Sequence, residues 1–229
     1  MLEIIATCIE DAMKIEENGG GRIELISSLT EGGLTPSYGL IEEVIKNVDI
    51  PVNVMIRPHA KSFVYSDRDI EIMIKDIEVV KKTGANGVVL GVLNKDGSID
   101  EKNLEKLLKH TGHLEVTFHK AIDESKNIIE SFKVLKKYPQ IKRVLTSGGI
   151  GKTIIDNTDV LKEMIKISEN QIIVLLGGGL TLENVEEVIK ITGAREVHFG
   201  TAIREDKEYL KDIDAEELKV LSKKVKSLI

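Results

Sequence analysis

Hydrophobic residues occur along the chain in short apolar runs that alternate with longer amphipathic stretches. The short runs have the length and branched composition of buried strands and span Leu2–Ala6, Arg22–Ile26, Val52–Ile56, Gly87–Gly91, Leu114–His119, Arg143–Thr146, Ile172–Leu176 and Glu196–Phe199. The longer stretches carry apolar residues at helical spacing and span Asp11–Glu17, Ser37–Lys46, Asp69–Lys82, Asp100–His110, Glu124–Lys137, Thr158–Ile167, Thr181–Ile191 and Ala215–Leu228. This strict alternation predicts parallel strands and an α/β fold, a single-domain (β/α)8 TIM barrel over residues 1–229.

The connections between these elements agree with a barrel. Helix-to-strand connections are short, as at Thr83–Ala85, whereas the strand-to-helix connections Ser27–Pro36 and Arg57–Arg68 are long. An open doubly wound sheet would normally carry a G-x-G-x-x-G turn after its first strand, and Ala6–Glu10 has no such pattern. We therefore expect the functional face at the carboxyl ends of the strands.

Polar residues occupy one parity of several strands, the parity that points into the barrel. Buried charges persist only when they are paired and hydrogen-bonded. One set stands at the strand starts and predicts a structural layer of ion pairs at the bottom: Glu3, Arg22, Glu115, Arg143 and Glu196. A second set stands near the strand ends, beneath the long loops, and predicts a functional site: Glu24, Arg57, His119, Ser147 and His198.

The fifth strand brings the densest group of ionisable side chains, since it ends in His119-Lys120-Ala121-Ile122-Asp123. The candidate catalytic residues are Glu24, Arg57, His119, Lys120, Asp123 and His198. His119 or Glu24 would act as general acid or base, and Arg57 with Lys120 would hold an anion. Asp123 would either orient His119 or Lys120, or cap a helix that begins at Glu124. A nearby carboxylate would raise the pKa of His119 and burial beside Arg57 would lower it, so the sign of the shift stays open.

Glycine clusters follow the last three strands. Consecutive glycines allow backbone N–H groups to converge on an anion, and the loops after strands seven and eight form the usual phosphate site of such barrels. The alternative is that these glycines only permit sharp turns. The candidate anion-binding residues are Ser147, Gly148, Gly149, Gly177, Gly178, Gly179, Gly200 and Thr201. No cluster has the Walker pattern, so a nucleoside triphosphate is not indicated.

Two loops have further features. The segment that starts at Arg57-Pro58-His59 carries Lys61, Phe63 and Tyr65, which suits either a lid over the mouth or a solvated loop anchored by its aromatic residues. In Glu31–Ser37, we expect Thr35 as the cap and Pro36 as the first residue of the next helix.

Composition narrows the possible partners. Apolar residues make up 41% and charged residues 31% of the 229 residues, which is typical of a soluble protein. The formal net charge of −6 argues against nucleic acid and anionic membranes as partners. Apolar runs such as Ile172–Leu176 are too short to span a bilayer. Cys8 is the only cysteine and the first residues do not suggest a signal peptide, so we expect a reducing, cytoplasmic location.

Several motifs together resemble the CutC family, which is linked by name to copper homeostasis. They are Arg22-Ile23-Glu24-Leu25, Glu31–Ser37, Ile56-Arg57-Pro58 with Phe63–Ser66, Thr117–Asp123, Val144–Gly148 and Glu196-Val197-His198. The resemblance extends from Leu2 to about Thr201 and implies a cytosolic (β/α)8 barrel, often a homo-oligomer, associated with copper tolerance and copper binding.

The chain departs from that family at positions that concern copper. Family members often carry cysteines where this sequence has Ile5 or Ala6 and Ile26. Cu(I) prefers thiolate and thioether ligands, and the candidates near the mouth are Cys8, Met55, His119 and His198. Two functions therefore remain open: a copper-linked protein that binds or traffics Cu(I), and an enzyme that acts on a small anionic or phosphorylated compound.

Overall fold

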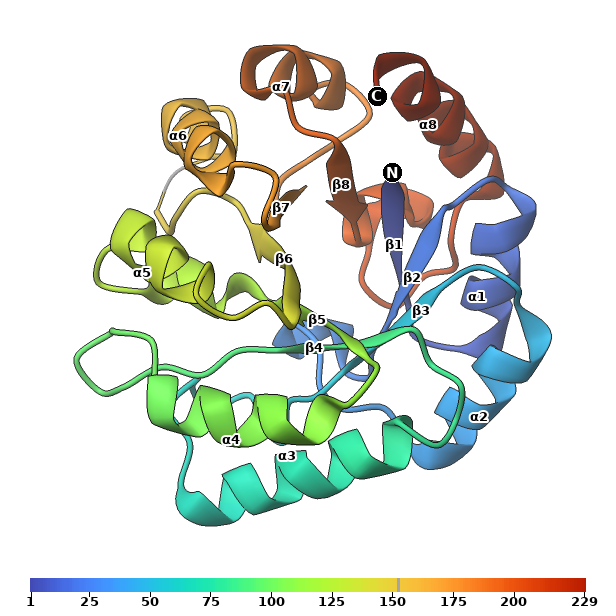
Figure 1. Cartoon of the computed structure of the whole chain (residues 1–229). Coiled ribbons are helices and arrows are strands. Elements are labelled where there is room, and N and C mark those ends of the chain that lie inside the picture. The colour runs from blue at the N-terminus through green and yellow to red at the C-terminus, as the bar shows by residue number, and fades with distance from the viewer. Residues whose placement is uncertain (152) are drawn as a thin grey trace.

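The computed structural model describes residues 1–151 and 153–229, and it confirms the (β/α)8 barrel. Its strands are all parallel and close into a ring in the order β1 to β8. Figure 1 shows the helices arranged outside this ring. The strands are β1 (Leu2–Ala6), β2 (Arg22–Leu25), β3 (Val52–Met55), β4 (Gly87–Leu90), β5 (Glu115–Phe118), β6 (Ile141–Thr146), β7 (Ile173–Gly177) and β8 (Glu196–Phe199).

Eight α-helices of the described chain cover the strands. They are α1 (Ile9–Glu17), α2 (Tyr38–Asn47), α3 (Asp67–Val80), α4 (Glu101–Thr111), α5 (Ile128–Leu135), α6 (Thr158–Ser168), α7 (Val185–Thr192) and α8 (Ala215–Leu228). Each begins or ends within a few residues of the predicted stretch, and α8 coincides with it. None of these helices is long and apolar enough to cross a membrane.

The region after β5 differs from the prediction. A single helix from Glu124 to Lys137 was expected, but the chain forms a 3-10 helix η2 (Lys120–Glu124) and begins α5 only at Ile128. The side chain of Asn127 accepts a hydrogen bond from the Glu130 N–H and caps α5. The helical periodicity of the sequence runs through both segments, so it does not reveal the break, and Asp123 does not cap α5.

The start of α2 also differs. Ser37 is its N-cap and accepts a hydrogen bond from the Leu40 N–H, so Pro36 is not the first helical residue. Thr35 has another role: its hydroxyl oxygen accepts a hydrogen bond from the Arg57 N–H at 2.9 Å. The loop before α2 is thereby tied to the end of β3.

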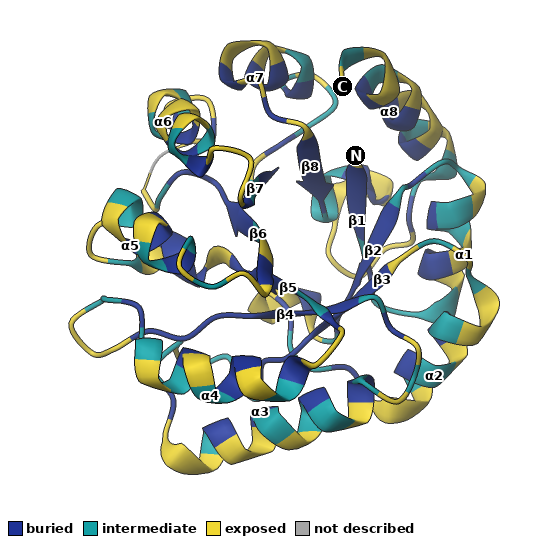
Figure 2. Cartoon of the chain, viewed as in Figure 1, coloured by how far each residue is buried: buried dark blue, intermediate teal, exposed yellow. Residues whose placement is uncertain are grey.

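Apolar side chains fill the layer between the strands and the helices. Figure 2 shows the helices buried on their inward stripes and exposed on their outer surfaces. Phe118, Phe132 and Phe199 are among the largest fully buried side chains of this layer. The outward parity of the strands therefore meets the amphipathic faces of the helices, as the sequence pattern predicts.

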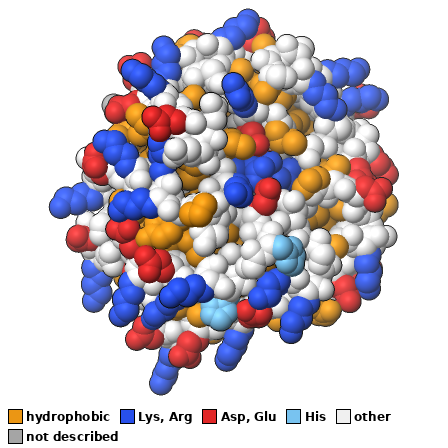
Figure 3. Space-filling model, viewed as in Figure 1, with side chains coloured by type: hydrophobic (Ala, Val, Ile, Leu, Met, Phe, Trp, Pro, Cys, Tyr) orange, Lys and Arg blue, Asp and Glu red, His pale blue; other side chains and the backbone are white. Residues whose placement is uncertain are grey.

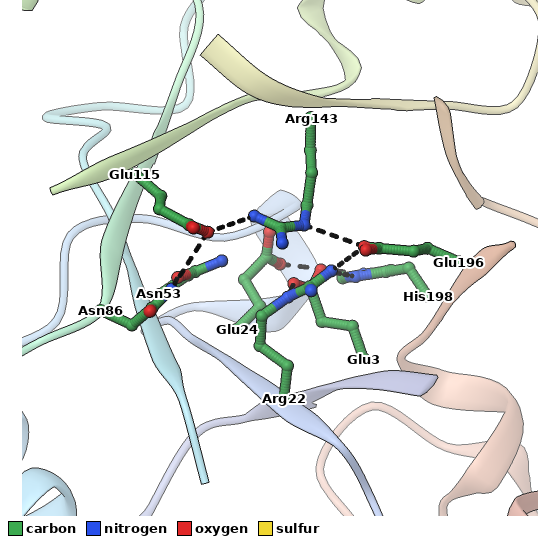
Figure 4. Close-up of polar contacts among 9 residues, drawn as sticks. All are labelled: Glu3, Arg22, Glu24, Asn53, Asn86, Glu115, Arg143, Glu196 and His198. Atoms are coloured by element: carbon green, nitrogen blue, oxygen red, sulfur yellow. Dashed lines mark hydrogen bonds and ion pairs between the residues drawn. The ribbon is translucent and has the colours of Figure 1, made fainter. Parts of the chain in front are cut away.

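The inward parity at the bottom of the barrel forms the predicted ion pairs, which we call the basal cluster: Glu3, Arg22, Glu115, Arg143 and Glu196 (Figure 4). Arg22 donates to Glu3 and to Glu196, each at 2.5 Å. Arg143 donates to Glu196 at 2.9 Å and to Glu115 at 2.5 Å. Acidic and basic side chains also meet near the centre of the face in Figure 3, over the opening of the ring of strands.

Replacing Arg22 by Met should lower the free energy of unfolding by about 3 to 5 kcal/mol, because it leaves Glu3 and Glu196 without a shared buried cation. Urea denaturation followed by circular dichroism measures this loss. The matched control is Lys190→Met, which breaks the solvent-exposed pair with Glu186 and should cost less than about 1 kcal/mol. Equal unfolding midpoints for the two variants would contradict the structural role of Arg22.

Candidate functional site

A cavity of about 510 Å³ lies at the carboxyl ends of the strands, on the predicted functional face. Most of the predicted site residues line it: Glu24, Arg57, His119, Lys120, His198, Gly178, Gly179, Gly200 and Thr201. Asp123, Ser147, Gly148, Gly149 and Gly177 are not among the residues that line it. The cavity wall also includes Met55 and Phe63.

Glu24 and His198 form a buried acid–imidazole pair at the inner end of the cavity. The Glu24 side chain comes from β2 and is only 2% exposed. Its Oε2 lies 3.8 Å from Nε2 of His198, and its Oε1 has no hydrogen-bond partner among the described residues. The other ring nitrogen of His198, Nδ1, lies 2.8 Å from Oε1 of Glu3 (Figure 4).

The pKa values of this pair follow from its surroundings. Burial raises the pKa of Glu24 to about 7, the nearby His198 opposes the rise, and the Glu3 carboxylate adds to it. Burial by itself lowers the pKa of His198, but the Glu24 and Glu3 carboxylates outweigh burial and raise it. Glu24 can therefore gain or lose a proton near neutral pH, as acid–base catalysis requires, and His198 holds its proton more strongly than an isolated histidine does.

His119 is held as a neutral imidazole. Its ring is 4% exposed, and Nδ1 accepts a hydrogen bond from the Ala121 N–H at 3.1 Å. Nε2 therefore carries the hydrogen, and it has no partner among the described residues. Burial, and then the nearby Arg57 charge, lower the pKa of His119 to about 3. This decides the sign that the sequence left open, and it makes His119 a hydrogen-bond donor rather than a base at neutral pH.

The loop that begins at Arg57 is folded against the mouth. The Arg57 guanidinium lies over the Phe63 ring at 4.8 Å, and that ring lies 4.8 Å from the ring of His119. Arg57 Nη1 also donates to the carbonyls of Glu31 and Gly33, at 2.7 and 3.0 Å. Phe63 thus lines the cavity, as a lid residue would, and it also anchors its own loop, as the alternative of an aromatic-anchored loop predicts. Lys61 is exposed and does not line the cavity.

Asp123 holds the loop after β6, and of its two predicted partners it approaches Lys120, whose Nζ lies 3.9 Å from Asp123 Oδ2, rather than His119. Its carboxylate accepts hydrogen bonds from the Thr146 hydroxyl, the Ser147 N–H and hydroxyl, and the Gly149 N–H. The Gly148 N–H donates to the Thr146 hydroxyl oxygen at 2.9 Å. Ser147 and Gly149 were predicted to bind an external anion, and in the structure their donors bind the Asp123 carboxylate.

The loops after β7 and β8 keep their donors available. No described residue accepts a hydrogen bond from the N–H of Gly178, Gly179 or Gly200. Gly178 and Gly179 have φ angles of +91° and +93°, which favour glycine. A Cβ at Gly178 would lie 2.5 Å from Nζ of Lys120, whose side chain is 45% exposed. An ammonium group and open N–H groups therefore meet at one side of the cavity.

Sequence reasoning missed some contributors to the site. A Cβ at Gly91 would lie 2.5 Å from Nδ1 of His119, so glycine at the end of β4 makes room for that ring. Gly177 was predicted as an anion-binding residue, and sequence reasoning missed that it gives space to His198: its Cβ would lie 3.0 Å from the His198 ring. Tyr209 lines the cavity from the loop before α8. The sequence signals for Gly91 and Tyr209 were weak: a single glycine at a strand end, and an aromatic residue in the last strand-to-helix loop.

The donor atoms do not suit Cu(I). Cys8 is absent from the cavity wall, and its Sγ accepts a hydrogen bond from the Asp11 N–H at the start of α1. Burial raises the pKa of the Cys8 thiol, which disfavours the thiolate that binds copper. Glu3, Glu24 and His198 have donor atoms within 4.8 Å of one another, but these are oxygen and imidazole nitrogen beside Arg22. Met55 is the remaining soft donor at the cavity.

Comparison with known proteins identifies relatives over most of the chain. The sequence model of the CutC family matches residues 1–203. The mouse copper homeostasis protein cutC homolog is 39% identical over 206 residues, which cover 90% of this chain and 75% of that protein. A CutC family protein of Enterococcus faecalis is 40% identical over 206 residues, which cover 86% of this chain and 97% of that protein.

Solved structures give the same result. The crystal structure of a CutC copper homeostasis protein from Streptococcus agalactiae has a TM-score of 0.83 at 33% identity and covers 89% of this chain and 99% of that one. Phosphoribosyl anthranilate isomerase from Thermococcus kodakaraensis has a TM-score of 0.62 at 17% identity, covering 98% and 97% of the two chains. At 17% identity, the similarity to the isomerase shows a shared fold.

Replacing His119 by Asn should flatten the acid side of the stability profile. The folded-state pKa of His119 lies below its unfolded value, so the wild type loses stability as pH falls below about 6.5. Between pH 7 and 4.5 the wild type should lose about 2 to 3 kcal/mol more than the variant. Urea titrations at both pH values measure the difference. The exposed His113→Asn variant is the control, and its profile should follow the wild type.

Proposed function

This chain belongs to the CutC family, and we propose that its barrel mouth binds a small anionic, phosphorylated compound and moves a proton on it. The observation that carries the proposal is the Glu24 carboxylate, which is buried, faces the cavity with one oxygen unpartnered, and has its pKa raised to about 7. A general base with a pKa near the working pH combines a useful fraction of carboxylate with strong proton affinity. His198 stands beside Glu24 and shares its proton.

The anionic part of the ligand would lie between Lys120 and the loops after β7 and β8. Lys120 supplies positive charge, and the N–H groups of Gly178, Gly179 and Gly200 are available as donors. Thr201 lines the same side of the cavity. Of the predicted anion-binding residues, those after β6 are left out, because Asp123 accepts from the N–H groups of Ser147 and Gly149 and the Thr146 hydroxyl accepts from the N–H of Gly148.

The reacting part of the ligand would lie between Glu24 and His119. The Nε2–H of His119 is a neutral donor suited to a carbonyl oxygen that gains negative charge as Glu24 removes a proton from the neighbouring carbon. The proton moves from that carbon to the Glu24 carboxylate, the C–H electron pair forms a double bond to the carbonyl carbon, and the C=O π pair moves onto the oxygen to give an enolate. Arg57 and His119 both contact the Phe63 ring, and burial together with the Arg57 charge keeps the imidazole neutral.

Copper is the second candidate, as cargo rather than as a reactant, because the family is named for copper homeostasis. The feature that favours copper is that Met55 and His119 line the same cavity, where His119 Nε2 has no hydrogen-bond partner among the described residues. One thioether and one imidazole give fewer soft ligands than a Cu(I) site normally has. A cytoplasmic location and a homo-oligomeric state stay predictions from the single cysteine and the family resemblance.

The proton-transfer proposal predicts exchange with solvent deuterium. In D2O, wild-type protein should introduce deuterium into at least one member of a panel of small phosphate monoesters that carry a carbonyl group, as measured by mass spectrometry. Replacing Glu24 by Gln should slow this exchange by about 10² to 10⁴-fold, and the wild-type rate should rise as pH increases through about 7. Inorganic phosphate should inhibit the exchange.

The control for that experiment is Glu10→Gln, which removes a carboxylate from an exposed position in the first turn of α1. It should exchange deuterium at the wild-type rate. An absence of exchange across the whole panel, or equal exchange in the wild type and the Glu24 variant, counts against the proposal.

Copper binding should be weak. Competition with a chromogenic Cu(I) chelator under reducing conditions should give an affinity no tighter than micromolar, because the cavity offers no thiolate. Replacing Cys8 by Ser should leave that affinity unchanged. Tight binding of one Cu(I) per chain that disappears with Cys8 or Met55→Leu would instead establish the copper-cargo function.

A further inference from the structure

We propose that Glu3 is a positioning residue for the mouth: it holds the His198 ring with its hydrogen on Nδ1, so that Nε2 faces Glu24 and the cavity. This inference rests on the proposed function, because it assigns a partner to the Glu24–His198 pair. It also connects the basal cluster, which the sequence indicates as purely structural, to the acid–base site.

Glu3 is shared between two neighbours in one layer of the barrel. The strand register pairs Glu3 with Arg22 on one side and with His198 on the other. Each carboxylate oxygen has its own partner: Oε2 accepts from Arg22 Nε at 2.5 Å, and Oε1 lies 2.8 Å from His198 Nδ1. Glu24 is paired with Ile5 in the register, two residues further along β1, and so stands on the mouth side of His198 (Figure 4).

The chemistry of Glu3 determines which nitrogen of His198 carries a hydrogen. The side chain is 0% exposed, and interactions with Arg22 and His198 overcome the effect of burial and lower the pKa of Glu3 to about 2. An ionised carboxylate only accepts hydrogen bonds, so Nδ1 must be the donor. Nε2 is then left to take up or release the proton that it exchanges with Glu24.

The rest of the basal cluster prevents Glu3 from turning away. Nη2 of Arg22 donates a hydrogen bond to Glu196, which also accepts a hydrogen bond from Arg143. The cluster contains three carboxylates and two guanidinium groups, so an imidazolium at His198 completes the charge balance. Other charged groups act on His198 from the mouth: Glu24 favours its protonation and Lys120 opposes it.

This arrangement can be tested on the whole chain without a substrate. Nitrogen-15 and carbon-13 NMR of the five histidines, with His198 assigned through a His198→Asn variant, reports both its tautomer and its titration. Above its pKa, wild-type His198 should be the Nδ1–H tautomer, which is the minor form of a free histidine side chain. Observation of the Nε2–H tautomer in the wild type would overturn the proposal without any variant.

Replacing Glu3 by Gln keeps the size of the side chain and removes its charge. The pKa of His198 should then fall by about one to three units, and the Nδ1–H tautomer should no longer dominate. The matched control is Glu196→Gln, an equivalent change in the same cluster that does not contact His198. It should destabilise the fold while leaving the His198 tautomer as in the wild type.

The outcomes separate this inference from the proposed function. If Glu3→Gln and Glu196→Gln both leave the tautomer and pKa of His198 unchanged, Glu3 has only a structural role. Proton transfer by Glu24 is then still tested separately by deuterium exchange. If the tautomer responds as expected and no deuterium is exchanged, the positioning role holds and the proposed reaction does not.

Discussion

Compensation of buried charge inside the barrel is the constraint on which the rest of this structure depends. Parallel strands enclose Glu3, Arg22 and Glu196 almost completely, and each charge is tolerated because an opposite charge lies within hydrogen-bond distance. Glu3 takes part in two such contacts, with Arg22 on the neighbouring strand β2 and with His198 on the neighbouring strand β8. The barrel therefore has a continuous polar interior from the bottom to the mouth, where many barrels of this type have layers of branched apolar side chains.

The mouth differs from the bottom because its charges are not all compensated. Arg57 is held by two backbone carbonyls, and Asp123 is surrounded by donors of the loop after β6. Glu24 keeps an unpartnered oxygen, and Lys120 is half exposed. Nζ of Lys120 lies 3.9 Å from Asp123 Oδ2 but remains open to the cavity, and a buried carboxylate oxygen without a partner costs stability and is found where a ligand completes it. His119 stays neutral because it is buried near the Arg57 cation, and no carboxylate of the described residues raises its pKa.

Membership of the CutC family and the chemistry of the cavity give different indications about copper. The family name refers to copper homeostasis, whereas the mouth of this chain offers Met55 and imidazole nitrogen but no thiolate. Cys8, the only cysteine, caps α1 through its sulfur. Carboxylate oxygen is a poor ligand for Cu(I), whereas the ammonium group and the open N–H groups suit the anion that we propose.

The sequence by itself determined the barrel, since the alternation of short apolar runs and helical stretches is a local property that leaves few alternative folds. Inward parity also predicted that Glu24 and His198 are buried inside the barrel, because the cost of burial depends on residue type and strand position alone. Tertiary structure decided what each polar group faces. Asp123 reaches across to the next strand, and His119 has a backbone donor rather than a carboxylate, and neither follows from spacing. Hydrogen-bond partners come from strands distant in sequence, so the protonation of the site is a property of the closed barrel.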